Sequence, residues 1–480
     1  MRKGGLIAAL AMLLAVPAAA QTFDRAPWLA DLEQARQAFH QKYANLEWLE
    51  EERGVKVDPL FEDLAKRLNR AQSEAQAMSV FQRLTQKLGD GHVEIDWPEP
   101  EAPAATAKAA ASAAPPPDLC RKIGYDARQN RPGTAQALPG YAPLPSSAAD
   151  PFDAGTIDAA GTKVGIIRIG LFMPQGYPAL CDAAVRELSI PAAKPCDDEC
   201  QDKVLTWAYR RMTAALEERV RALKAAGATV LLVDISNNGG GSEWAEAAVR
   251  IVSPKPLRSE RLGFVRGEHW AQQWGDLHDR LTHFAANAKG QDRANLLKWA
   301  AEADAARRDA SLDCSNGSCS RIGTAGYSTG LVGEIPAGSF AGKDWGVYVF
   351  SPAQYAYHDS VWDGPLIVLT DQETWSAAEE FAAVLQDNKS ATVLGERTGG
   401  AGCGYTYGGT PTKLANSGAV LKLPDCVRYR ADGSNEVRGI IPDEPVGLRA
   451  NDGLQLRATL IAERLPAAIS RARALARADR

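Results

Sequence analysis

Between Pro365 and Gly404 the chain reads PLIVLTDQETWSAAEEFAAVLQDNKSATVLGERTGGAGCG. The apolar run Leu366–Leu369 is typical of a short buried strand, and a helix with an apolar face is expected to begin at Ser376. Ser376 would then lie where unpaired N–H groups and the positive end of a helix dipole stabilise negative charge. That position suits an attacking serine. A serine followed three residues later by Glu379 is, however, also the signature of a capping box.

The composition and the start of the chain limit the possible functions. The chain has 480 residues, and its net charge of −5 argues against a nucleic-acid partner. It begins MRKGGLIAALAMLLAVPAAAQ, which is typical of a secretory signal cleaved near Ala20. No apolar run is long enough to span a bilayer, so no membrane partner is expected. The sequence therefore predicts a soluble exported protein, periplasmic or secreted.

Eight cysteines suit an oxidising compartment, and their even number suggests up to four disulfides. We expect Cys403 to pair with Cys426 and Cys314 to pair with Cys319. Cys196 and Cys200 have the spacing of half a zinc site, but no matching histidine pair lies near them in sequence. Structural disulfides are therefore favoured there, and no metal and no cofactor are predicted.

The pattern along the chain predicts a modular organisation. The predicted segments are a signal peptide (1–20), an N-terminal helical domain (21–97), a Pro/Ala linker (98–117), an irregular segment (118–155), an α/β domain (156–465) with a helical insertion (255–355), and a C-terminal helix (466–480). Alternating strands and helices after residue 156 imply a mixed or parallel sheet with helices outside. Among the later elements we expect a strand at 347–350, a pair of strands at 420–423 and 426–430, and two helices near 452–463 and 466–477.

Three further motifs are candidates for a functional site. The stretch LGDGHVEI places His92 at a helix–turn–strand corner. The glycines 239–241 follow a predicted strand and can point N–H groups at one oxygen, but the lysine of a phosphate-binding loop is missing. A GxSxG motif surrounds Ser328, yet no helix is expected after it, so it does not match the nucleophile elbow of α/β-hydrolases.

Several stretches occur in an order that points to one family. They are LGDGHVEI, VGIIRIGLF, VLLVDISNNGGGS, PLIVLTDQETWSAAEEFAAVLQD, GERTGG and GIIPDEPV. Together they resemble the tail-specific, or C-terminal processing, serine peptidases, a superfamily that includes the tricorn protease core and the interphotoreceptor retinoid-binding protein modules. The resemblance covers most of 80–97 and 156–446, except the insertion. It implies a crotonase-like or Clp-protease-like α/β spiral, a peptide or protein substrate and Ser376 as nucleophile. No PDZ domain is recognisable.

The resemblance also distinguishes between two branches of the superfamily. The processing-peptidase branch carries a lysine base where this chain has Ala401. The tricorn-like branch uses a histidine from the N-terminal region and a glutamate before a G-x-x-PD motif, which His92 and Glu436 match. One departure is Gly91, because the tricorn core has a serine at that position. The tricorn-like resemblance therefore implies His92 as general base and Glu436 as an orienting or charge-stabilising group.

Roles for the neighbouring groups follow from the same site. The N–H groups of Ala377 and Gly240 are expected to hold the oxyanion. Glu379 and Glu380 are expected to be solvated or capping groups, since glutamates usually occupy exposed faces.

Three alternatives stay open, one of which is a degenerate scaffold with an occluded site. In a retinoid-type binding module, Trp375, Tyr355 and Tyr357 would line a pocket for an apolar ligand. In a Ser-Lys peptidase, Lys389 and Lys413 are the nearest lysines after the serine.

Overall fold

The computed structural model describes residues 23–98, 119–147, 150–191, 195–314, 317–404, 411–449 and 451–478. The predicted signal peptide and, apart from Pro98, the predicted linker 98–117 lie outside the described residues.

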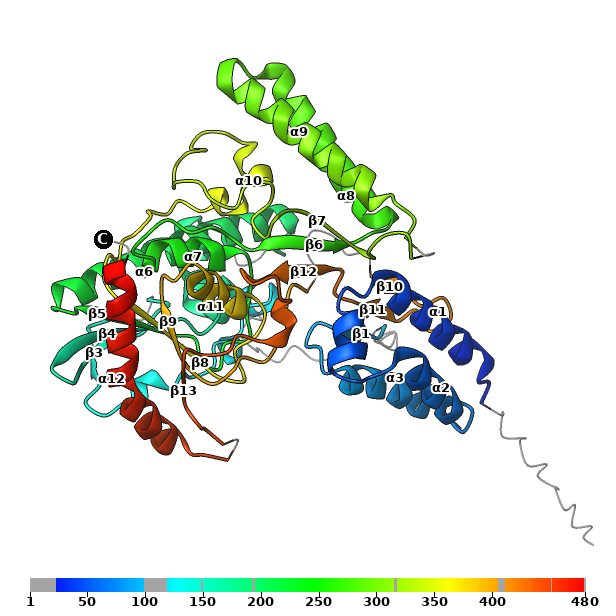
Figure 1. The fold of residues 1–480 in the computed structure, drawn as a ribbon, viewed down its shortest axis with the longest axis horizontal. Helices are drawn as coiled ribbons and strands as arrows, with labels where there is room; N and C mark the ends of the chain where they lie inside the picture. The colour runs from blue at the N-terminus through cyan, green and yellow to red at the C-terminus, as the bar shows by residue number, and fades with distance from the viewer. Residues whose placement is uncertain are drawn as a thin grey trace, which may run out of the picture.

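A seven-stranded sheet forms the centre of the molecule (Figure 1). Its strand order is β13-β9-β8-β5-β4-β3-β2, and β4, β5, β8, β9 and β13 run parallel, while β2 and β3 complete an antiparallel edge. Every residue of β5 and of β8 is buried, as expected for parallel strands covered on both faces. The strands are β2 (Ala142–Pro143), β3 (Ala154–Ala159), β4 (Thr162–Arg168), β5 (Val230–Asp234), β8 (Leu366–Thr370), β9 (Thr392–Gly395) and β13 (Glu444–Pro445).

Helices cover both faces of this sheet. One face, which includes Leu231 and Val368, packs against α6 (Asp198–Ala225), α7 (Trp244–Val252) and α11 (Ala377–Asp387). The other face, which includes Leu232 and Leu369, packs against α12 (Leu454–Ala478). The predicted α/β architecture with helices outside a largely parallel sheet is therefore confirmed.

The C-terminal helix differs from the prediction, because one helix, α12, replaces the two that were expected. Pro466 lies inside it and is exposed. A proline in a helix interior costs about 3 kcal/mol relative to alanine. Buried side chains on both sides of it, including Ile461 and Ile469, pack over the same sheet face and outweigh that cost.

The N-terminal helices form a second core together with strands from late in the chain. They are α1 (Ala26–Lys42), a π-helical turn (Trp48–Glu52), α2 (Val57–Leu68) and α3 (Glu74–Leu88). A small sheet in the order β1-β11-β10 packs on them, formed by β1 (Glu94–Asp96), β11 (Val420–Lys422) and β10 (Thr412–Lys413). Asp31 of α1 accepts hydrogen bonds from Asn416 and Ser417. The N-terminal core therefore extends beyond 21–97 to residues near 420.

The expected pairing of strands 420–423 and 426–430 is wrong. Strand β11 pairs with β1, whereas β12 (Cys426–Tyr429) pairs with β6 (Arg261–Val265). Between them Pro424 accepts a hydrogen bond from the N–H of Ala44, at the point where the chain passes from the small sheet to β12.

The insertion contains a pair of long helices, as predicted. Helices α8 (Glu268–Asn287) and α9 (Gly290–Ala310) stand away from the central sheet (Figure 1). Strand β7 (Ile322–Tyr327) pairs with β6. The strand expected at 347–350 is wrong: the segment forms a helical turn, α10 (Gly346–Val349), next to Trp345, whose ring packs on Trp299 of α9.

The remaining elements are short. They are α4 (Leu119–Lys122), α5 (Pro178–Glu187) and the 3₁₀ turns Ala127–Gln129, Ala135–Ala137, Pro174–Gly176, Ser351–Gln354 and Glu436–Arg438. Among the described residues, no helix is both long enough and apolar enough to cross a membrane.

Four disulfides join the eight cysteines. The predicted pairs Cys403–Cys426 and Cys314–Cys319 are both present. Cys196 is bonded to Cys200, which excludes these sulfurs as thiolate ligands of a zinc ion. The fourth disulfide joins Cys120 to Cys181.

Candidate active site

Ser376 lies at the end of the loop between β8 and α11, with φ of +55°. A positive φ is costly for a residue with a side chain and persists only where the surroundings fix it. The preceding loop is fixed in this way. The N–H of Trp375 donates to the carbonyl of Asn238, and Asp371 accepts a hydrogen bond from the N–H of Asn237. The loops after two neighbouring strands, β5 and β8, thus hold the serine between them.

His92 approaches this serine from the N-terminal core. Its Nε2 lies 3.0 Å from Ser376 Oγ, and its Nδ1 lies 2.9 Å from the carbonyl oxygen of Ala401. A carbonyl can only accept a hydrogen bond, so Nδ1 carries the proton and Nε2 is left to accept from the serine hydroxyl. The two residues predicted as nucleophile and base are therefore side by side.

The corner that carries His92 is anchored through Asp90. One oxygen of this buried carboxylate accepts from Tyr43 and Asn45, and the other accepts the N–H of His92 itself. The histidine backbone is therefore fixed to the N-terminal core.

Two glycines beside this corner are required by close packing. A Cβ at Gly91 would lie 2.5 Å from the ring of Trp375, so the indole fills the space that a serine side chain would take. A Cβ at Gly404, on the other side, would lie 3.0 Å from the His92 ring. The departure from the tricorn pattern at Gly91 thus has a steric reason.

Glu379 differs from the expectation that it is solvated, because its side chain is fully buried. Its carboxylate accepts the N–H of Ser376, which is the capping contact that the sequence suggests. It also accepts from the N–H groups of Gly400 and Ala401 and from the hydroxyl of Thr398. Burial, reinforced by the charge of Glu436, raises the pKa of Glu379 to about 7. One carboxylate thus links the backbone of Ser376 to the turn whose carbonyl contacts His92.

Glu436 does not contact His92 in this structure. Its carboxylate binds the guanidinium of Arg428, with 2.8 Å between Arg428 Nη2 and Glu436 Oε1. Arg428 also donates to the carbonyls of Gly402 and Ser376, and its Nη1 lies 3.0 Å from Glu380. Glu436 is therefore linked to the carbonyl of Ser376 through Arg428, a residue that no motif in the sequence indicates. Glu380 is buried in this ion pair rather than solvated.

The N–H groups near Ser376 identify candidate oxyanion donors. Ala377, the first residue of α11, has an N–H with no acceptor among the described residues, and the same holds for Gly241. The N–H of Gly240, in contrast, donates to Asn238 Oδ1 at 2.8 Å. A Cβ at Gly240 would lie 2.7 Å from the Cβ of Ser376, so this glycine provides close approach. The geometry favours Gly241 over the predicted Gly240 as the second donor.

A cavity of about 240 Å³ opens directly onto these groups. It is lined by His92, Gly241, Ser242, Glu243, Ser328, Ser376, Ala377, Glu380, Cys403 and Arg428. The described lining contains no lysine. Ala401 occupies the position of the family lysine and supplies the carbonyl that His92 contacts.

Ser328, the serine of the GxSxG motif, also lines this cavity but lies in a different setting. Strand β7 leads into it, and a turn rather than a helix follows. Its hydroxyl donates to Glu246 at 2.9 Å. Since a carboxylate and not the histidine receives that hydrogen bond, Ser328 lacks the arrangement of an activated nucleophile.

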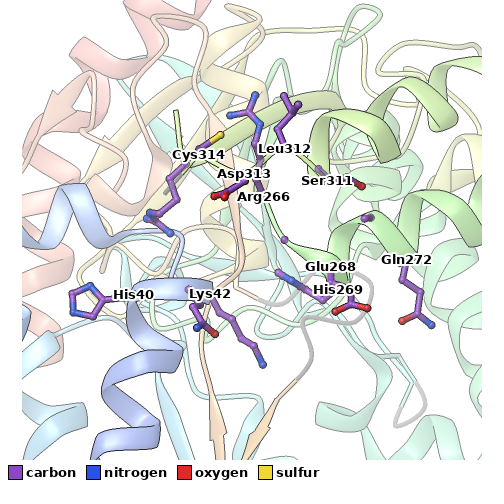
Figure 2. A pocket seen from close by; sticks show the side chains of 15 residues that line it. His40, Lys42, Arg266, Glu268, His269, Gln272, Ser311, Leu312, Asp313 and Cys314 are labelled. Carbon is purple, nitrogen blue, oxygen red and sulfur yellow. The ribbon is translucent and has the colours of Figure 1, made fainter. Parts of the chain in front are cut away.

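A larger cavity of about 1000 Å³ lies elsewhere, between the end of α1 and the insertion (Figure 2). Figure 2 shows His40 and Lys42 on one side of it and Arg266, Glu268 and His269 on the other. Its lining includes neither Ser376 nor His92, so the chemistry described above is not located there.

The aromatic residues of the ligand-binding alternative do not line a common pocket. Tyr355 and Tyr357 are buried beside a separate cavity of about 300 Å³ in the insertion. Trp375 lies instead against Gly91 and Gly399, next to His92 and Ser376.

Comparisons with known proteins give the family and the fold of this chain. The sequence profile of peptidase family S41 matches residues 203–446, just over half of the chain. A carboxyl-terminal-processing protease from Synechocystis sp. is 50% identical over 86 residues, which are 18% of this chain and 19% of that protease. The chain thus spans about a fifth of the length of that relative.

Two solved structures share the fold over nearly the whole chain. Mature CPAF is 16% identical, with a TM-score of 0.57 over 95% of this chain and 98% of that one. Mature CPAF complexed with lactacystin is 15% identical, with a TM-score of 0.55 over 94% of this chain and 99% of that one. At such identities the likeness shows the fold alone, and it confirms the α/β fold that the resemblance implied.

Proposed function

The chain belongs to peptidase family S41, and from this premise we propose that it is a serine peptidase with Ser376 as nucleophile and His92 as general base. The observation that carries the proposal is the 3.0 Å separation of His92 Nε2 and Ser376 Oγ, with the proton of His92 held on Nδ1. We propose further that it acts on peptides or proteins after export to an oxidising compartment. Four disulfides and the signal-like start of the chain support that location.

The proposed reaction is an acyl transfer in two halves. Ser376 Oγ attacks the peptide carbonyl while its proton moves to His92 Nε2. The N–H groups of Ala377 and Gly241 hold the oxyanion, and one such donor is worth roughly 3–4 kcal/mol in comparable sites. His92 then gives the proton to the leaving amine, and water releases the acyl group by the reverse sequence.

In this proposal, the two roles of the third residue of a catalytic triad are performed by different groups. In a Ser-His-Asp triad an aspartate orients the histidine and stabilises its positive charge. Here the carbonyl of Ala401 takes the orienting role, and Glu379 fixes that carbonyl through the N–H of Ala401. Glu436 would contribute negative charge through Arg428, which donates hydrogen bonds to Glu436 and to the carbonyl of Ser376.

Two experiments test the proposal. A fluorophosphonate probe is expected to label the full-length mature protein at Ser376, and Ser376→Ala is expected to abolish both the label and peptide hydrolysis. His92→Ala should lower kcat by on the order of 10³-fold, as for a member of a catalytic unit.

The controls separate this site from a Ser-Lys site. Lys413→Ala is the suitable lysine control, because Lys389 has φ of +55° and substitution there also changes the backbone. It should change kcat less than about tenfold, as exposed substitutions do. Near-normal kcat in His92→Ala beside an inactive Lys413→Ala would return the chain to the Ser-Lys branch. An apolar-ligand module would give no covalent adduct at all.

A further inference from the structure

The cavity beside Ser376 is lined mainly by residues with polar side chains. Two of its lining residues, Ala377 and the half-cystine Cys403, have apolar side chains, and the described lining contains no Phe, Tyr, Trp or branched aliphatic side chain. Ser242 and Ser328 contribute hydroxyls, and Glu243, Glu380 and Arg428 contribute charges. A pocket that rewards an apolar side chain needs apolar walls. This one therefore gains little from burying such a side chain.

Carboxylates outnumber the cations at the inner end of the cavity. Arg428 is the cation in the described lining, and Glu380, Glu436 and Glu260 all lie within 3.7 Å of its guanidinium. Arg430 is the other guanidinium near them, at 3.7 Å from Glu260. Arg428 already donates to two of these carboxylates and to two carbonyls. Its charge is therefore offset before a substrate arrives.

The pKa of Glu380 reflects its burial among other carboxyl groups. Burial raises the pKa of Glu380 to about 8, against the pull of Arg428 and with a contribution from the charges of Glu246 and Glu436. A cation brought next to Glu380 would favour its charged form. A positively charged ligand group at the inner end of the cavity would therefore be stabilised by Glu380.

The outer end of the cavity carries a second carboxylate. Glu243 lines the cavity, is exposed, and follows Gly241 by two residues at the start of α7. Its carboxylate makes no hydrogen bond or ion pair with any residue that the structure describes. One carboxylate at the rim and one at the inner end thus face the same small space.

We propose that this cavity receives the side chain of a lysine or arginine on the acyl side of the scissile bond, with Glu243 and Glu380 as its carboxylate partners. The inference rests on the proposed function. The side chain of the residue whose carbonyl is attacked leaves the chain one bond from that carbonyl, so it enters the cavity that contains Ser376, Ala377 and Gly241. A long cationic side chain can lay its methylene stem along the wall and place its charge between the two carboxylates. An acidic side chain is repelled by the carboxylate of Glu243 and meets a guanidinium, that of Arg428, whose charge is already offset, so it is rejected.

Covalent probes that differ in one side chain test this inference. Peptidyl diphenyl phosphonates with lysine, leucine or glutamate at the phosphonate residue would be compared by their inactivation rate constants on the full-length mature protein. The lysine probe should react at least about tenfold faster than the leucine probe, the scale on which one pocket contact discriminates between substrates. The glutamate probe should be the slowest of the three.

Variants of the rim residue separate charge from shape. Glu243→Gln should slow the lysine probe about fivefold, as expected for an ion pair at an exposed rim, and leave the leucine probe unchanged. Glu243→Lys should slow the lysine probe further. Glu463→Gln, an exposed glutamate on α12 at the far face of the sheet, is the matched control and should change neither rate.

The outcomes distinguish the two proposals. Preference for leucine or glutamate, or a lysine preference that Glu243→Gln and Glu243→Lys leave unchanged, would overturn the inference while the peptidase assignment stands. Failure of all three phosphonates together with failure of the fluorophosphonate would overturn the proposed function itself.

Discussion

The Glu379 carboxylate accepts hydrogen bonds from the N–H groups of Ser376, Gly400 and Ala401 and from the hydroxyl of Thr398. In the proposed peptidase Glu379 is a positioning residue, since it holds both the backbone of Ser376 and the carbonyl that contacts His92 and is not among the residues that line the cavity. A shift of about 1 Å in a reacting group can cost on the order of 10²-fold in rate.

Removing this carboxylate should therefore slow the chemistry more than it weakens substrate binding. We expect Glu379→Ala to lower kcat by about 10²-fold with little change in KM, because positioning acts on the transition state. Steady-state kinetics on a peptide substrate measure this. Glu373→Ala, an exposed glutamate in the neighbouring loop, is the control. A purely structural role would instead reduce the fraction of folded enzyme and leave kcat per active site unchanged.

The same residue should leave a signature in the pH dependence of stability. The pKa of Glu379 is raised from 4.5 to about 7 in the folded protein. The folded state therefore binds a proton that the unfolded state has lost, and the stability from this group is present below pH 4.5 and lost as pH rises through 7. The loss is about 3 kcal/mol, from 1.4 kcal/mol for each pKa unit.

Urea unfolding of the wild type and of Glu379→Gln at several pH values checks this sign. The free energy of unfolding of the wild type, relative to that of the variant, should fall between pH 5 and pH 7.5. A difference that stays constant or rises over that range would show that the carboxyl is not protonated in the fold.

Single residues also show where sequence reasoning succeeds and where it stops. The strand–loop–helix pattern around Ser376 and the corner around His92 were enough to find two side chains that meet at 3.0 Å. The serine–glutamate spacing of a capping box is the same whether the helix start is exposed or buried. The sequence therefore does not predict that the Glu379 side chain is buried. The free N–H in the glycine turn depends on where the Asn238 side chain points, which no local pattern encodes.

At the scale of elements, α12 provides a test of helix energetics. Pro466 is exposed inside this helix and lacks the N–H that would continue the hydrogen-bond ladder. We expect Pro466→Ala to stabilise the protein by about 2–2.5 kcal/mol, which is the helix penalty of about 3 kcal/mol less the unfolded-state entropy that proline removes. The urea midpoint should rise at constant activity. A lower midpoint would mean that packing contacts of the proline ring stabilise the protein by more than the missing hydrogen bond destabilises it.

The elements that the sequence mispredicted share one cause. Strand β11 and strand β12 have the composition of a hairpin, yet each joins a different sheet. Residues 347–350 have strand composition but form α10. In both cases partners distant in sequence decide the outcome, whereas the strands of the central sheet are apolar enough to be recognised alone.

At the scale of the whole molecule, Cys403–Cys426 joins the glycine turn after α11 to β12. The two cysteines have a sequence separation of 23. Removing this disulfide should lower the free energy of unfolding by about 3 kcal/mol. We expect Cys403→Ser/Cys426→Ser to lower activity as well, because Gly404 packs against the His92 ring. Urea unfolding and kcat measure the two effects.

The disulfide in the insertion is the matched control. Cys314–Cys319 closes a shorter loop, with a sequence separation of 5. Cys314→Ser/Cys319→Ser should cost about 1 kcal/mol less and leave kcat unchanged. Equal losses of activity in the two double variants would argue against a specific role for the turn at Gly404.

The sequence provides the least indication of how the N-terminal core is built from distant segments of the chain. Helices before residue 90 have clear periodicity, but nothing local indicates that residues 412–423 complete their core. The proximity of His92 and Ser376 could nonetheless be predicted, because both residues lie in recognisable motifs even though the cores that hold them are built from distant segments.

His92 and Ser376 are synthesised at different times, because they lie far apart in the sequence. His92 and Ser376 are 284 residues apart, and a ribosome adds about 5–20 residues per second, so the histidine emerges roughly a quarter of a minute to a minute before the serine. The strands that complete the histidine's own core emerge later still, at β10 and β11. A growing chain therefore carries His92 without Ser376 for as long as the 284 residues between them are being added. In the peptidase proposed here, the catalytic pair is expected to form only after residues 412–422 have been made, so a fragment that ends before them is expected to show no proteolytic activity.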